Sequence, residues 1–399
     1  MEKEEKLNSS AKNLIACEFL NSIIDLFIHT FLVAYLLNIT NDNISSVAIY
    51  YIFDFILLGS CMYLLGFLFK KHNIANIYRL GIIFKCIFVL AIVFLKQDIK
   101  NYLIPIAIIF GIAEATYWGS CDNLIAYVTN NKNRLNYITS RRIVMTLTKI
   151  IMPLVLGTSI ELLSFSKVST YVLIIAVIEV ILCFFIKINN KNSEPFCLGA
   201  FLKSLKNHKN ISRLKTLYKS SILYGILLDI IPTMITILIV MTFKTNFHLG
   251  LLSTILAICS MLTLFIYRKF SNSKRIKTVL ILGGLISLAS VISLILNIGK
   301  IELIIYNFIS NSFIVILEVI FNTERFNHLC NGIEEKYIIE NQVFITMIMQ
   351  IGRIVGYGIL LIASTLNNII YFKITLLLFT IFIPIYSLYM YKLQTISKP

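Results

Sequence analysis

Twelve apolar runs, most of them long enough to cross a lipid bilayer and three of them shorter, limit what this chain can fold into. They lie at residues 14–37, 46–69, 80–95, 102–128, 140–162, 170–187, 218–241, 250–267, 279–297, 303–321, 341–366 and 369–391. A membrane-spanning helix needs about 20 mostly apolar residues. The pattern therefore predicts an all-α integral membrane protein with about twelve transmembrane helices.

The composition excludes the main soluble classes. Only 14% of residues are charged and 58% are hydrophobic, whereas soluble proteins carry roughly 25% charged residues. This excludes a cytosolic enzyme, a disordered regulator and a nucleic-acid-binding domain. The sequence contains no GxxxxGK[ST] or HExxH motif, and its five histidines do not cluster. We therefore expect no enzymatic activity, no cofactor and no metal site. The eight cysteines form no CxxC pair, so we expect buried, reduced thiols.

The basic residues predict the orientation in the membrane. With the N-terminus inside, the cytoplasmic segments hold 27 Lys and Arg residues and the outer loops hold 6. Cytoplasmic loops carry such an excess in membrane proteins. We expect a multi-pass protein of the cytoplasmic membrane with both termini in the cytoplasm. The charged start of the sequence predicts a cytoplasmic tail rather than a signal peptide.

The longest loop, 188–217, is basic and separates two sets of six helices, at 1–187 and 218–399. A shift of 204 positions relates the halves: it takes Asp25 to Asp229, Glu114 to Glu318, and Lys149 to Arg353. Because each half has six helices, both halves start on the same side of the membrane. The sequence therefore predicts two bundles related by an axis along the membrane normal.

Two stretches carry motif residues. GFLFKKHNIANIYRLG runs from Gly66 to Gly81 with a basic residue at Lys71, and MPLVLG contains Pro153 and Gly157. With the twelve helices and the six-plus-six repeat, these stretches resemble the major facilitator superfamily. The first corresponds to that family's loop between helices 2 and 3. The second corresponds to the Gly-Pro-x-x-Gly-Gly pattern of its antiporters, although Met152 and Leu156 replace two of the glycines. The resemblance implies two bundles that rock around a central cavity lined by helices 1, 4, 7 and 10.

Acidic residues inside the predicted spans are the main functional signal, because each costs about 2.5–3.5 kcal/mol at the centre of a membrane helix. Eight are present: Glu18, Asp25, Asp54, Glu114, Asp122, Glu179, Asp229 and Glu318. In the run at 14–37, Glu18, Asn21, Ser22, Asp25 and His29 share about 100° of one helical face. We interpret Glu18, Asp25 and His29 as a proton or cation relay, with Asp25 as the main carrier. The alternative is hydrogen bonding that only holds helices together.

A second set of residues predicts the substrate cavity. In the run at 102–128, acids stand beside aromatic residues, an arrangement that suits an amphipathic or cationic substrate. Asp229, near Pro232, and Glu318 are their counterparts in the second half. The predicted cavity residues are Glu114, Tyr117, Trp118, Asp122, Asp229 and Glu318.

Cations inside the predicted spans need acidic partners, since an unpaired buried charge is prohibitive. The repeat predicts Glu114 as the partner of Lys149, and Glu318 as the partner of Arg353. Arg325 is a candidate for an inner gate, and a solvated loop arginine is the alternative. We expect Lys85 to extend towards the membrane surface. Asp54 and Glu179 have no predicted role.

Together these features predict a secondary transporter that works by alternating access. The excess of intramembrane acids favours proton-coupled efflux of an amphipathic or cationic compound. The alternatives are a nutrient uptake symporter or facilitator, a non-transporting immunity or sensor protein, and a lipid-linked flippase. The expected partners are a small-molecule substrate, protons and the lipid bilayer, with no nucleic acid, and the chain is expected to be a monomer.

Overall fold

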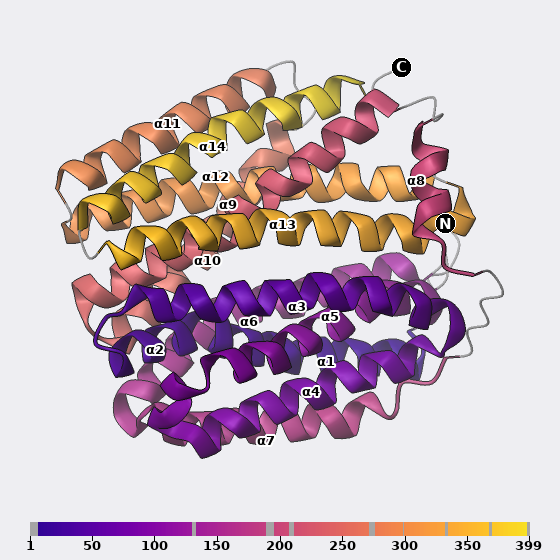
Figure 1. The fold of residues 1–399 in the computed structure, drawn as a ribbon, viewed down its shortest axis with the longest axis horizontal. Coiled ribbons are helices and arrows are strands. Elements are labelled where there is room, and N and C mark those ends of the chain that lie inside the picture. The colour runs from indigo at the N-terminus through magenta and orange to yellow at the C-terminus, as the bar shows by residue number, and fades with distance from the viewer. Residues whose placement is uncertain are drawn as a thin grey trace. The chain divides into compact units, whose positions relative to one another are not determined.

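The structure is a computed structural model that describes residues 7–129, 133–188, 195–206, 211–270, 276–297, 299–331, 334–366 and 369–396. All regular structure in these ranges is helical, and twelve helical segments are long and apolar enough to cross a membrane (Figure 1). Each predicted span has one of them as its counterpart, which confirms the predicted fold class.

The first half of the chain contains α1 (Ser9–Leu26), the π-helical η1 (Phe27–Leu32), α2 (Val33–Ile39), α3 (Ile44–Lys71), α4 (Ile74–Leu95), the 3-10 helix η2 (Lys96–Asn101), α5 (Leu103–Val128), α6 (Arg134–Leu163) and α7 (Phe165–Cys183). The second half contains α8 (Leu198–Lys206), α9 (Ile211–Phe243), α10 (Asn246–Phe270), α11 (Ile276–Leu296), α12 (Lys300–Asn331), the 3-10 helix η3 (Glu335–Tyr337), α13 (Ile338–Thr365) and α14 (Ile369–Ile396).

The segment 188–217 was predicted as a loop, but it contains α8 and the start of α9. Phe201 and Leu205 recur on one face of α8, and both pack with Leu214 of α9 in a small hydrophobic cluster. The ring of Phe344 in α13 lies 6.1 Å from that of Phe201. The helix is too short to span a membrane, but the spacing of its apolar residues gives α8 one buried face.

The chain divides into two compact units. Unit 1 comprises Met1–Asp42, Ile49–Phe196 and Thr245–Thr254, and unit 2 comprises Asn43–Ala48, Cys197–Lys244 and Ile255–Pro399. In unit 1, α4 packs against α5 and α7, and α1 packs against α6 and α7. In unit 2, α9 packs against α13 and α14, and α11 packs against α12 and α14.

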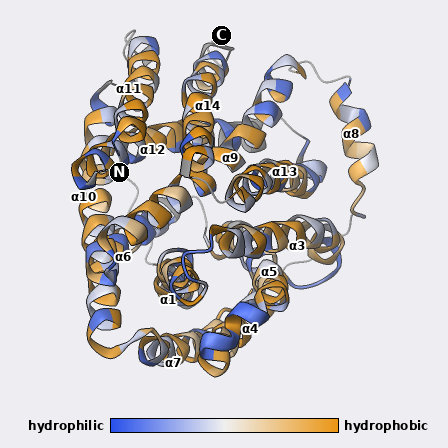
Figure 2. Cartoon of the chain, turned by 60° about the vertical axis from the view of Figure 1, so that its left-hand side comes forward, coloured by the Kyte–Doolittle hydropathy of each residue, from blue (hydrophilic) through white to orange (hydrophobic). Residues whose placement is uncertain are grey.

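The helices present apolar side chains outwards as well as inwards. Hydrophobic residues cover most of their length (Figure 2), and α7 exposes Tyr171, Ile174 and Ile181. Large exposed apolar surfaces are rare on soluble monomers, so these faces fit contact with lipid.

Gly81 allows α4 and α5 to approach each other closely. A Cβ atom at this position would come within 2.6 Å of the backbone nitrogen of Tyr117 and 2.9 Å of Thr116 Oγ1. These distances are shorter than real Cβ contacts, so any side chain at Gly81 would push the two helices apart.

We expect Gly81→Ala to lower the free energy of unfolding by about 1–3 kcal/mol, the usual cost of overpacking. Thermal unfolding of the purified protein in detergent measures this effect. Gly358→Ala in α13 is the matched control, because a Cβ there meets no heavy atom within 4 Å. The control should melt at the same or a higher temperature, since alanine favours helix over glycine. Equal destabilisation by both substitutions would contradict this account of the α4–α5 contact.

Candidate functional site: a lysine between two carboxylates

The ammonium group of Lys85 is buried in unit 1 between two helices that each supply a carboxylate. Lys85 Nζ donates hydrogen bonds to Asp25 Oδ1 at 2.6 Å, to Asn21 Oδ1 at 2.8 Å and to Glu114 Oε1 at 2.7 Å. An ammonium group has three N–H donors, so this arrangement uses all of them. We call Asn21, Asp25, Lys85 and Glu114 the Lys85 cluster.

The remaining carboxylate oxygens of the cluster also have donors. Asn21 Nδ2 donates to Asp25 Oδ2 at 2.7 Å, and Trp118 Nε1 donates to Glu114 Oε2 at 2.9 Å. Buried ion pairs are tolerated only when their remaining hydrogen-bonding capacity is satisfied. The cluster meets this condition, and it still holds two carboxylates against one ammonium.

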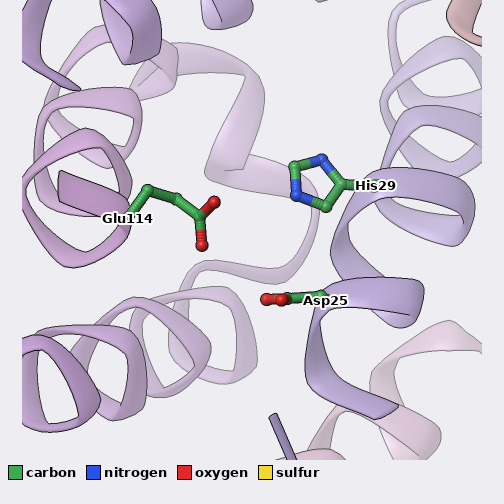
Figure 3. A group of neighbouring side chains, drawn as sticks. All are labelled: Asp25, His29 and Glu114. Atoms are coloured by element: carbon green, nitrogen blue, oxygen red, sulfur yellow. The ribbon is translucent and has the colours of Figure 1, made fainter. Parts of the chain in front are cut away.

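The helical periodicity of α1 places its part of the cluster. Asn21 and Asp25 are four residues apart and therefore lie on one face, and His29 follows one turn later in η1. Single π-helical turns occur frequently at functional sites. Figure 3 shows Asp25 and His29 pointing towards Glu114 of α5, and ligating atoms of all three lie within 4.8 Å of one another.

A carboxylate, an imidazole and a second carboxylate form a donor set that metal ions accept. In this conformation, however, Lys85 takes one oxygen from each carboxylate. A positive charge of the chain itself therefore lies where a bound cation would be held, and a metal ion would have to displace it.

Lys85 was predicted to extend towards the membrane surface, and this prediction was wrong. Its side chain is only 1% exposed, and Nζ also lies 4.6 Å from the centre of the Tyr117 ring. Hydrogen bonds to three oxygens and the contact with the ring compensate for the loss of hydration.

Glu18, the first residue of the predicted relay, belongs to a separate group of contacts. Its Oε1 accepts hydrogen bonds from Arg141 Nε at 2.7 Å and from Cys121 Sγ at 3.1 Å. Its Oε2 accepts one from Tyr137 at 3.0 Å. Glu18 and Asp25 therefore share a face of α1 but not their partners.

The structure separates the aromatic residues of the predicted cavity. Trp118 is 43% exposed, whereas Tyr117 is buried and packs against Tyr78. Tyr117 therefore supports the cluster from behind, and Trp118 is the accessible one. The side chain of Asp122 lies outside the described residues.

The predicted pair of Lys149 with Glu114 was wrong, and the ion pair that the structure gives for Arg353 is with Asp229 rather than the predicted Glu318. Glu114 pairs with Lys85, while Lys149 is exposed on α6. Arg353 pairs with Asp229 and also donates to Gln350 Oε1 at 2.9 Å. The repeat preserves the positions of acids, but each acid meets the cation that the packing of the helices brings to it.

The other predicted residues of unit 2 lie around Tyr224 of α9. Glu318, Arg325 and Arg353 all act electrostatically on its hydroxyl group. Near the C-terminal end of α12, Glu324 forms an ion pair with Arg213 of α9 at 2.6 Å. A gating role for Arg325 stays a prediction.

Four residues were missed or left without a role: the buried Asp54, Tyr137 and Glu179, and the partly exposed Arg141. Asp54 and Glu179 are fully buried. Their charge inside an apolar run was the available signal, but a run of sequence does not show which helix will face them.

This fold and site define a class: helical membrane proteins that carry ion pairs inside the membrane, as transporters do. The model of the Major Facilitator Superfamily matches residues 14–357. The chain belongs to this superfamily, as the sequence resemblance predicted, and it is a multi-pass membrane protein.

Solved structures share the fold across nearly the whole chain. The nucleoside transporter NupG has a TM-score of 0.70 and 15% identity, covering 97% of this chain and 99% of that one. A point mutant of NupG has a TM-score of 0.68 and 15% identity, covering 98% and 100%. A bacterial metal transporter has a TM-score of 0.66 and 12% identity, covering 98% and 100%. At these identities the likeness concerns the fold alone. No curated protein sequence matches the chain.

We expect Lys85→Met to destabilise the protein by about 3–5 kcal/mol, because two buried carboxylates would lose their cation. Adding Glu114→Gln should restore part of this loss, since it removes one of the two charges. Unfolding in detergent measures both effects. Lys149→Met is the matched control and should change stability by less than about 0.5 kcal/mol. Similar stabilities for Lys85→Met and Lys149→Met would contradict the cluster.

Proposed function

We propose that this protein is a proton-coupled secondary transporter. It exports an amphipathic, positively charged compound across the cytoplasmic membrane by alternating access, with both termini in the cytoplasm. The observation that carries this proposal is the charge of the Lys85 cluster, where Asp25 and Glu114 share a single ammonium group.

The second carboxylate of the cluster leaves one negative charge that a proton can neutralise. The positive charge of a substrate can neutralise it equally well. Because both cannot do so at once, binding of one favours release of the other, and this competition is the basis of exchange. A proton taken up from outside would release the substrate there, and a new substrate molecule would release the proton inside.

Trp118 supports the choice of an amphipathic cation. Its ring is partly exposed, and its Nε1 is hydrogen-bonded to Glu114. An exposed indole beside a carboxylate offers a cation both a π face and an opposite charge. Asp25 is also within reach, since 16% of its side chain is exposed.

The resemblance of one stretch of α6 to the antiporter pattern supports export as the direction. Pro153 and Gly157 carry the resemblance to the antiporter pattern in the sequence. Both lie against Gly250 of α10, where a Cβ on Gly157 would come within 2.6 Å of Asn246 O. The antiporter-like residues of α6 therefore form a close helix contact within unit 1.

We expect substrate-dependent proton flux in proteoliposomes that contain a pH-sensitive dye and carry an imposed proton gradient. A panel of cationic, neutral and anionic amphiphiles is added in turn, and cationic compounds should produce the flux. Asp25→Asn should reduce it to the level of empty liposomes, because the amide group cannot exchange a proton.

Asp98→Asn is the matched control for this measurement. It makes the same change of carboxylate to amide as Asp25→Asn, but at an exposed position in η2. It should leave the flux unchanged. Flux of the same size in Asp25→Asn would refute the assignment of the carrier. Flux with neutral compounds only, or movement of substrate in the direction of the protons, would favour uptake instead.

A further inference from the structure

Glu179 of α7 is a buried carboxyl group that the proposed exchange does not use. It is fully buried, and neither of its side-chain oxygens has a hydrogen-bond partner among the described residues. Glu18, Asp25 and Glu114 each have donors on both oxygens. A buried carboxylate without donors is very costly, so these surroundings fit the protonated, uncharged form.

The packing of α7 against α4 places Glu179 at the level of Lys85. Arg79 of α4 donates from Nη2 to Ile186 O at 2.8 Å and from Nε to Cys183 O at 3.4 Å. The two helices run antiparallel and rise equally per residue. Glu179, four residues before Cys183, therefore lies about level with residue 83 of α4, next to the turn that holds Lys85.

Electrostatic interactions agree with this register, since Glu179 interacts with both Lys85 and Asp25. Titratable groups face this region from every helix packed against α7 or its neighbours. They are Cys17, Glu18 and Asp25 of α1, Tyr78, Arg79, Lys85 and Cys86 of α4, Glu114, Tyr117 and Cys121 of α5, Tyr137 and Arg141 of α6, and Cys183 of α7 itself. Among these cations, Lys85 forms ion pairs with two carboxyl groups, Asp25 and Glu114, whereas Arg141 pairs with Glu18.

We infer that Glu179 is a second proton-binding site of unit 1 and the alternative partner of Lys85. Asp25, Glu114 and Glu179 then share one proton around one ammonium group. This inference names the store of the proton in the exchange proposed above, and so it rests on that function.

The transfer balances in charge and in protons. The O–H bond of Glu179 breaks, an O–H bond forms on Asp25, and one N–H of Lys85 turns from Asp25 to Glu179. Before and after this step the group holds two carboxylates, one carboxylic acid and one ammonium. The net charge inside the membrane does not change, so the step adds no buried charge.

Infrared difference spectroscopy of the full chain in lipid bilayers tests the proton on Glu179 without any substrate. A protonated carboxyl group has a carbonyl stretch that an ionised one lacks. We expect this band in the wild type at neutral pH, its loss in Glu179→Gln, and its retention in Asp98→Asn. Absence of the band from the wild type, or its persistence in Glu179→Gln, would overturn the inference.

Two further measurements complete the test. Glu179→Gln should unfold at nearly the same temperature as the wild type, because the amide replaces an uncharged acid of the same shape. A large fall in the melting temperature would indicate an ionised, paired glutamate and count against the inference. In Lys85→Met, the band should persist to higher pH than in the wild type, since no ammonium remains to stabilise the anion. An unchanged pH dependence would exclude Lys85 as the alternative partner.

The infrared results are independent of the transport assay. If the band behaves as expected but no compound produces proton flux, the proposed function fails and the proton site stands. If flux depends on Asp25 but the band is missing, the function stands and the site on Glu179 fails.

Discussion

A positive charge inside a low-dielectric interior is the constraint on which unit 1 depends. Lys85 lies in the middle of α4, and an unpaired ammonium there would be prohibitive. Its compensation comes from Asn21 and Asp25 of α1 and from Glu114 of α5. The helices must therefore stay close and in register. Gly81, one turn before Lys85, lies against the backbone at Tyr117, three residues after Glu114. Because α4 and α5 run antiparallel, the contact of Gly81 with Tyr117 lies next to the contact of Lys85 with Glu114. The absence of a side chain at Gly81 therefore lets Lys85 reach Glu114.

The buried charges are balanced differently in the two units. In unit 1, Glu18 and Arg141 form one neutral pair, and the Lys85 cluster has one carboxylate in excess. In unit 2, Asp229 and Arg353 form a neutral pair that Gln350 supports. A neutral pair carries no net charge. Among the described buried ion pairs, the carboxylate in excess therefore lies in unit 1.

Hydrophobic length and helical periodicity predicted much of this structure from the sequence. The twelve spans follow from run length alone, and the stripe on α1 follows from the 3.6-residue period, which depends only on local geometry. The partners of Lys85, Glu18 and Arg353 could not be predicted in the same way. Periodicity shows that Glu18 and Asp25 share a face, but it does not show that α6 meets one and α4 the other. The rotation of each helix about its axis depends on packing details such as Gly81, and these involve residues far apart in the chain.

The repeat misled for a related reason. It made Lys149 the equivalent of Arg353 and so predicted Glu114 as the partner of Lys149. Lys149 is exposed, and Lys85 contacts Glu114 instead. Lys85 has no charged counterpart at the repeat distance. The two halves have acids at equivalent positions, but a buried charge can be neutralised from any adjacent helix, so the cation can come from a different helix in each half. Asp25 and Asp229 illustrate this, since Asp25 pairs with Lys85 of α4 and Asp229 pairs with Arg353 of α13.

The position of the excess charge also limits how a proton can arrive. Asp25 keeps 16% of its side chain exposed, while Glu114 keeps 9% and Glu179 is fully buried. The three carboxyl groups thus form a gradient of access around one ammonium group. In the exchange proposed above, Asp25 is therefore the carboxyl group through which a proton would enter and leave, and Glu179 is its proposed buried store.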